Sequence, residues 1–96
     1  MIHMHTARIK VEFDEEPKFS RKPPCPQRFI WQKKTFQIEE MISEWRTEGQ
    51  IKAKLRYIGV ARVHFRVRVI NGRIFDIYYD PRSKAGEWIL SAEILS

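Results

Sequence analysis

The sequence predicts an all-β fold, a small antiparallel barrel or roll of about six strands. Several segments alternate apolar and polar residues with a period of two, which is typical of half-buried strands. The connections between them are short and contain the Gly, Pro, Asn and Asp residues that favour turns. The 96 residues, 43% of them hydrophobic, provide for one domain over 1–96 with a single modest core.

The first predicted strand is Thr6–Asp14, in which Ala7, Ile9 and Val11 alternate with charged residues. A proline-rich connection over 14–28 follows. Proline lacks a backbone N–H and does not pair inside a sheet, so we expect this connection to be extended and either packed along the surface or loosely ordered.

A pair of short strands is predicted next, Phe29–Trp31 and Thr35–Ile38, joined by the polar turn Gln32–Lys34. The residues that follow, 38–46, are ambiguous. Their apolar positions have the spacing of a helical stripe, and the alternative to a strand is one short helix around 38–46.

We favour a continued strand over 38–46, because the stretch is barely two turns long and follows a strand without a capping residue. A bulge near Glu39-Glu40 would shift the apolar alternation from Phe36 to Met41 and Trp45. A further strand-like segment, 51–57, alternates apolar residues with Lys52, Lys54 and Arg56.

The most informative segment is Arg62–Asp80, which predicts two strands around Asn71-Gly72. A two-residue loop would mix charged and apolar residues on both faces. A three-residue loop, Ile70–Gly72, instead places Arg66 opposite Asp76 and separates an apolar face from a charged one, so we predict this register. The last strand, Trp88–Ile94, follows a polar turn.

This register assigns each side chain of the hairpin to a face. The apolar face holds Val63, Phe65, Val67, Val69, Phe75, Ile77 and Tyr79, and the opposite face holds Arg62, His64, Arg66, Arg68, Ile74, Asp76 and Tyr78.

The positive charge of the chain is concentrated in its second half. The formal net charge is +6, and residues 49–75 contain seven Lys/Arg and no Asp/Glu. Such a run fits either a polyanion-binding surface or a solvated strand face that protects a sheet edge from aggregation.

No catalytic or metal-binding motif is present, so we predict a non-enzymatic protein without cofactor or metal. A zinc site needs three or four ligands, and the imidazoles and thiol available are His3, His5, His64 and Cys25. Cys25 lies among prolines, with no base to activate it. One cysteine and no long apolar run predict a cytoplasmic protein that does not enter membranes.

The order of several short motifs over residues 26–90 resembles a known family. The motifs are Pro26-Gln27-Arg28-Phe29-Ile30-Trp31, Phe36-x-Ile38, Ile42-x-x-Trp45-Arg46, His64-Phe65-Arg66-Val67-Arg68, Gly72-x-x-Phe75-Asp76-Ile77-Tyr78-Tyr79-Asp80 and Trp88-x-Leu90. The chain resembles a small bacterial domain of unknown function that occurs alone and at the carboxyl end of some Y-family (ImuB/UmuC-like) translesion DNA polymerase homologues. The resemblance implies an accessory role in replication or repair and carries over no catalytic residues.

These observations favour a module that binds nucleic acid through a basic β-face or sits beside a DNA-handling protein. The residues predicted to make the contact are Lys52, Lys54, Arg56, Arg62, Arg66, Arg68 and Tyr78. The alternative is an adaptor that docks onto a DNA polymerase or another acidic protein, with Ile74 and Tyr78 as anchors. A third hypothesis places a small ligand in an enclosed apolar pocket near Asp80 and Trp88.

Overall fold

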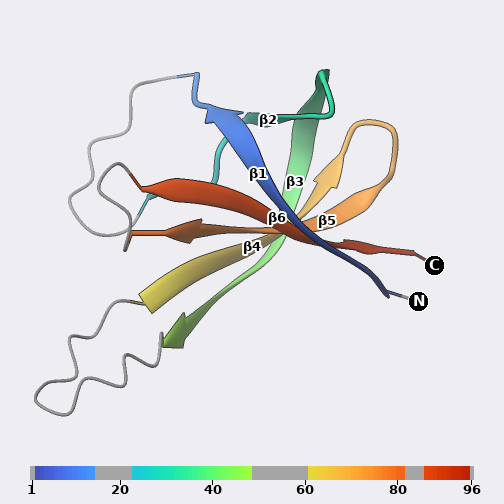
Figure 1. Ribbon diagram of the computed structural model, residues 1–96. Coiled ribbons are helices and arrows are strands. Elements are labelled where there is room, and N and C mark those ends of the chain that lie inside the picture. The colour runs from blue at the N-terminus through green and yellow to red at the C-terminus, as the bar shows by residue number, and fades with distance from the viewer. Residues whose placement is uncertain (1, 15–22, 49–60, 82–85, 96) are drawn as a thin grey trace, which may run out of the picture.

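The computed structural model describes residues 2–14, 23–48, 61–81 and 86–95. These residues form a closed antiparallel barrel in which each strand pairs with the next in sequence and the last pairs with the first (Figure 1). The strands are β1 (Ile2–Glu12), β2 (Arg28–Trp31), β3 (Lys34–Glu48), β4 (Ala61–Val69), β5 (Ile74–Asp80) and β6 (Glu87–Ile94). The predicted all-β class is confirmed.

The barrel closes through β1, which pairs with β6 over most of its length and with β2 at its end. The two chain ends therefore lie side by side (Figure 1). β1 begins at Ile2, earlier than the predicted Thr6, because its first residues pair with the end of β6.

The turn between β2 and β3 has two residues, one fewer than predicted. Gln32 and Lys33 both have positive φ, 53° and 63°, and Trp31 pairs directly with Lys34. A two-residue turn with both φ values positive matches the right-handed twist of the flanking strands, so Lys34 belongs to the sheet.

The ambiguous stretch 38–46 is part of β3, as favoured, and contains the predicted bulge. Glu39 is the extra residue between the pairs Ile38↔Val69 and Glu40↔Arg68. A second register shift, between Met41 and Ser43, was not predicted. Each extra residue reverses the side-chain alternation. Trp45 consequently pairs with His64, on the face opposite to the one expected for it.

The β4–β5 hairpin has the predicted register. Arg66 pairs with Asp76 and Val67 with Phe75, and the loop has three residues, closed by a 2.8 Å hydrogen bond from the Gly72 N–H to the Val69 carbonyl. Gly72 has a φ of 92°, the left-handed conformation that the bulged turn requires.

β6 contains an extra residue in its pairing with β5, which the regular alternation of its sequence does not predict. Asp76 pairs with Ala92, whereas Ile77 pairs with Leu90, so Ser91 is an extra residue. Ala92 thus lies on the side of Asp76, and Glu93 lies on the side of Phe75, which faces the interior.

The barrel interior is filled by aliphatic residues and a cluster of three phenylalanines. The buried core consists of Ile9, Phe29, Phe36, Val63, Phe65, Val67, Val69, Phe75, Ile77 and Leu90. The ring centroids of Phe29, Phe36 and Phe75 are 5.0 to 5.4 Å apart. The apolar face predicted for β4 and β5 is therefore the core, with Tyr79 only half-buried.

The described part of the proline-rich connection is more buried than expected. Pro23 and Pro26 are fully buried, and Gln27 donates a backbone hydrogen bond to Glu12 and accepts one from Ile38. A proline ring can be buried without orphaning a donor, because it has no N–H. Pro24 is exposed and Cys25 and Gln27 are half-buried, so residues 23–27 pack along the barrel with two proline rings turned inward.

An ion pair covers the phenylalanine cluster. Arg73 donates two hydrogen bonds to the buried Glu93, of 2.8 and 2.9 Å, and its guanidinium lies 4.9 Å from the ring centre of Phe75. The hydrogen bonds and the charge of Arg73 lower the pKa of Glu93. The pair lets a carboxylate remain ionised at the border of an apolar core.

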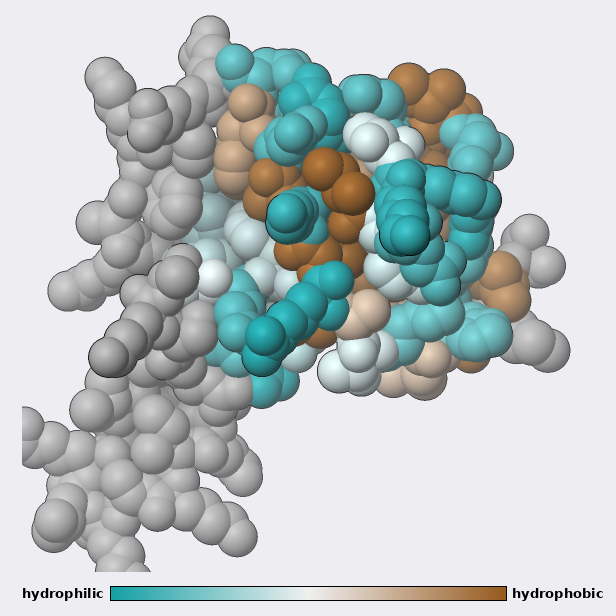
Figure 2. Space-filling model, turned by 45° about the horizontal axis from the view of Figure 1, so that its top comes forward, coloured by the Kyte–Doolittle hydropathy of each residue, from teal (hydrophilic) through white to brown (hydrophobic). Residues whose placement is uncertain are grey.

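Figure 2 shows one face of the molecule, on which hydrophilic side chains surround a smaller apolar area. Apolar side chains also reach the surface along β3, where Met41 is 45% and Ile42 41% exposed. In the described part of the chain, no helix is long and apolar enough to cross a membrane.

Substituting Gly86 with alanine will destabilise the barrel more than substituting Gly72. Both glycines have positive φ, but a Cβ at Gly86 would overlap the Tyr79 hydroxyl and lie 2.6 Å from ring atom Cε1, and one at Gly72 would meet nothing within 4 Å. We expect Gly72→Ala to cost about 1 kcal/mol and Gly86→Ala about 2–4 kcal/mol. Urea unfolding of both variants measures the difference, and equal losses would contradict the close contact.

Candidate nucleic-acid interface

Three aromatic rings stand in a row on the outer face of the barrel. Trp45, His64 and Tyr78 come from β3, β4 and β5 and are direct cross-strand neighbours. Trp45 and His64 are parallel, with ring centroids 5.2 Å apart and planes within 8°, and His64 lies 5.0 Å from Tyr78. We call these three residues the ring column.

The guanidinium groups of two arginines lie over rings of the column. These arginines are two residues before and two residues after His64 in β4. The Arg62 guanidinium carbon is 5.0 Å from the ring centre of Tyr78, and that of Arg66 is 5.7 Å from the ring centre of Trp45. A guanidinium is attracted to the negative face of an aromatic ring. The cations therefore contact the rings instead of extending into solvent.

Each described arginine of the predicted site also has a carboxylate partner. Arg66 donates two hydrogen bonds to Asp76, of 2.7 and 3.0 Å. Arg68 is bonded to Glu40. These side chains and that of Arg62 keep 35–37% of their surface exposed.

Arg62 is held less tightly than the other two arginines. Its Nε lies 3.4 Å from an Asp80 carboxylate oxygen, yet the geometry does not make a hydrogen bond, and Nε is buried without a hydrogen-bond partner. Of the three pairs, the one between Arg62 and Asp80 is the easiest to open for an incoming anion.

The described residues are electrically neutral as a group. They include ten Lys/Arg and ten Asp/Glu, so the net charge of +6 comes from the eight basic and two acidic residues at the other positions. The outer face of β3–β5 therefore combines exposed cations with their counter-charges, including the Arg66–Asp76 pair that the predicted register placed together.

His64 is a neutral ring near pH 7. Burial is the largest cause of its lowered pKa, and the positive charge of Arg62 lowers it further. Its Nε2 shares a 2.7 Å hydrogen bond with the Thr47 hydroxyl. A neutral imidazole stacks on Trp45 and packs at a 40° tilt against Tyr78 without repelling the arginines on either side.

The structure brings four of the seven predicted contact residues together, namely Arg62, Arg66, Arg68 and Tyr78. Lys52, Lys54 and Arg56 lie outside the described residues, as does the strand predicted over 51–57. The sequence analysis missed Trp45 as a member of this face. The signal for it was weak, because only a second bulge in β3 turns its side chain outward.

The structure also shows the surroundings of the candidate nucleophile Cys25 and of the possible metal ligands. Cys25 packs against the core, and burial raises its pKa to about 11, helped by the negative charge of Glu44, so its thiol stays protonated at neutral pH. Within the described ranges, no group of three His, Cys, Asp or Glu side chains is arranged to hold a metal ion.

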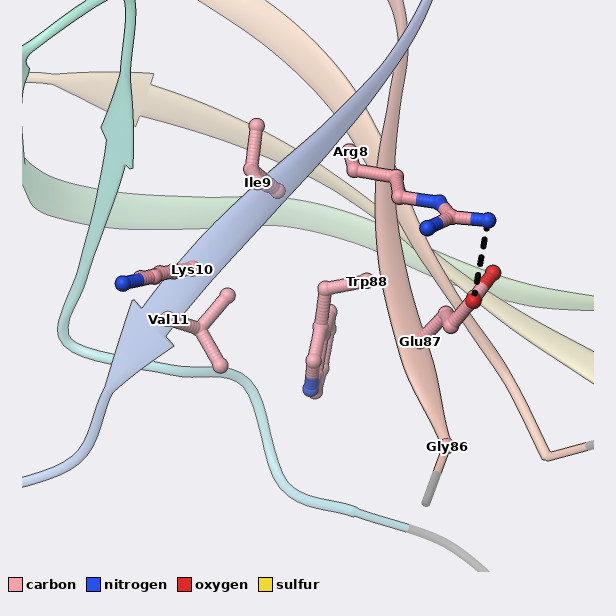
Figure 3. Close-up of a pocket in the computed structure, with 7 residues that line it drawn as sticks. All are labelled: Arg8, Ile9, Lys10, Val11, Gly86, Glu87 and Trp88. Carbon is pink, nitrogen blue, oxygen red and sulfur yellow. Dashed lines mark ion pairs between the residues drawn. The ribbon is translucent and has the colours of Figure 1, made fainter. Parts of the chain in front are cut away.

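A pocket of about 370 Å³ lies beside Trp88, between β1 and β6 (Figure 3). Ile9, Val11 and Trp88 form its apolar wall, and Arg8 and Glu87 are joined by an ion pair at its rim. The pocket is open to solvent and not enclosed as the third hypothesis required, and Asp80 does not line it.

The fold and the outer face define a small closed β-barrel domain that presents stacked rings beside paired arginines. Residues 1–94 match a family described as a domain of unknown function (DUF6504), and the chain belongs to that family. Neither a curated protein nor a solved structure matches it.

Replacing His64 with phenylalanine will reduce the loss of stability in mild acid. The pKa of His64 is lower in the folded chain than its ordinary value of 6.5, so the unfolded chain binds more protons between those two values. The contribution of His64 to stability is therefore complete above pH 6.5 and declines as the pH falls below it.

Denaturant unfolding at pH 7.5 and 5.0 checks this expectation. The wild type should lose more free energy of unfolding between the two pH values than His64→Phe, which keeps an aromatic ring in the column. Equal losses would show that His64 is not held neutral by its surroundings.

Proposed function

We propose that this domain is a non-enzymatic nucleic-acid-binding module whose contact surface is the outer face of β3, β4 and β5. The observation that carries the proposal is the ring column of Trp45, His64 and Tyr78 with Arg62 and Arg66 beside it. Proteins that bind single strands use aromatic rings to stack with bases and cations to follow phosphates.

The outer face of β3–β5 offers three aromatic rings for base stacking, but its arginines are only partly available for phosphates. Its described arginines are shared with carboxylates, so phosphates must compete with Glu40, Asp76 and Asp80. Lys52, Lys54 and Arg56 follow β3 and precede β4 in sequence, and both strands belong to this face. We propose that these three residues provide additional phosphate contacts.

The biological setting that we propose is DNA repair or translesion synthesis in the bacterial cytoplasm. Support comes from the ordered motifs that resemble a domain found beside Y-family (ImuB/UmuC-like) polymerase homologues. A module that holds single-stranded template near a polymerase would need affinity without base specificity, and base stacking provides this.

A second candidate function, an adaptor that docks onto a DNA polymerase or another acidic protein, is favoured by the paired arginines. Interfaces between proteins often combine apolar anchors with a polar rim. Met41 and Ile42, which precede Trp45 of the ring column in β3, are exposed. The predicted anchors Ile74 and Tyr78 are half-buried.

Labelled single-stranded and duplex oligonucleotides should bind the full chain at low salt and dissociate as salt rises. Arg62→Gln should weaken binding of every sequence several-fold and reduce the salt slope by about one. Arg62 is suited to this test because its contacts, a 3.4 Å ion pair with Asp80 and a cation–π contact with Tyr78, belong to a partly exposed side chain. Its loss should therefore cost little stability. Fluorescence anisotropy at several salt concentrations measures both quantities.

Lys34→Gln is the matched control, because it removes one exposed charge at the other end of β3. It should leave both affinity and salt slope nearly unchanged. If no oligonucleotide binds at any salt concentration, the nucleic-acid proposal is wrong and the adaptor function is supported.

A further inference from the structure

Among the described residues, the ring column ends at an unpaired strand edge, that of β3. β2 pairs with β3 only over Lys34–Gln37, and the Ile38 N–H bonds to Gln27. From Glu39 to Glu48, β3 has β4 as its only strand partner among the described residues. An unpaired strand edge presents backbone N–H and C=O groups that can bond an incoming molecule.

Trp45 is the last ring of the column on this free edge. Its two described contacts, with the ring of His64 and the guanidinium of Arg66, both come from β4. Because His64 is the neighbour of Trp45 on β4, its ring stacks on the indole face that turns toward β4. No other ring of the described residues stacks on the indole, so one flat aromatic group can extend the column at the β3 edge.

Arg46 supplies an uncompensated cation at the same place. It follows Trp45 in β3, is exposed, and makes no ion pair with the residues that the structure describes, unlike the three arginines of β4. Adjacent residues of a strand are about 3.3 Å apart and project to opposite faces. A ligand at the edge can therefore touch the indole on one side and the guanidinium on the other.

We propose that the free edge of β3 binds one unpaired nucleotide, with its base stacked on Trp45 and its phosphate on Arg46. The inference rests on the proposed function and makes it more specific, since it assigns the stacking position and selects single strands. The rings stand in a row across the strands, so their faces lie parallel to the strand edge. A base must enter beside β3 to reach Trp45, and a base stacked inside a duplex is not free to do so.

The direct test uses the intrinsic fluorescence of the full chain with a short oligothymidylate and a matched abasic oligonucleotide. The oligothymidylate should quench tryptophan emission, and the abasic strand should not. Trp45→Phe should abolish the quenching while keeping most of the affinity. Trp45→Leu should weaken oligothymidylate binding about five- to hundredfold and leave the abasic strand unaffected.

Two further variants separate the parts of the proposed contact. Arg46→Gln should weaken both oligonucleotides alike and reduce the salt slope by about one. Trp31→Phe is the matched control, because Trp31 packs near His5 and Phe75, away from the ring column, and its loss should leave the quenching intact. Near-ultraviolet circular dichroism confirms that each variant is folded.

The outcomes distinguish this inference from the proposed function. Binding of oligothymidylate with unchanged affinity in Trp45→Leu would overturn the nucleotide site and leave the nucleic-acid function standing. Equal affinity for duplex and single strands would also overturn it. Failure of every oligonucleotide to bind would overturn both.

Discussion

The pairing of β4 with β5 is the constraint on which the outer face depends. Because Arg66 lies opposite Asp76, the buried apolar side chains of the hairpin point into the barrel. The arginines of β4 lie on the outer face, together with Ile74 and Tyr78. The three-residue loop closed at Gly72 fixes this register. A slip of one residue would bury arginines, so the core and the contact surface are established by one and the same set of strand pairs.

Two bulges in β3 complete the contact surface by changing which side chains it presents. With no extra residue after Met41, Trp45 would turn toward the interior side of the sheet. With the extra residue, its indole stacks on His64. The four-residue β2 pairs only with the first residues of β3. Among the described strands, the ring column therefore ends at an unpaired edge of β3.

The charge of the outer face of β3–β5 is balanced, because each of its arginines on β4 pairs with a carboxylate. Asp80 and Asp76 pair with Arg62 and Arg66, the two arginines that lie over the rings. Glu40 pairs with Arg68, and the described part of the barrel is neutral overall. In the proposed function, such a surface would recognise its ligand through shape and stacking more than through charge. The basic residues of 49–56 carry the electrostatic part of the proposal.

The sequence predicted the fold class, the β4–β5 register and the bulge at Glu39, because each depends on local alternation and turn chemistry. It did not predict the extra residues near Ile42 and at Ser91, since a bulge is fixed by the partner strand as much as by its own residues.

The sequence also left the burial of Pro23 and the pairing of Arg68 with Glu40 undetermined. Both are contacts between segments far apart in the chain. For the same reason, alternation along the chain placed Arg66 opposite Asp76. It did not predict the ion pairs of Glu40 with Arg68 and of Asp80 with Arg62.

The most direct test of the central claim is a titration of the ¹⁵N-labelled chain with a single-stranded oligonucleotide, followed by NMR. The account predicts that the indole N–H signal of Trp45 and the backbone signals of neighbouring β3 and β4 residues shift, while the indole signals of Trp31 and Trp88 stay in place. Shifts confined to Trp88 and the pocket beside it, or no shifts at all, would contradict the assignment of the outer face of β3–β5 as the contact surface.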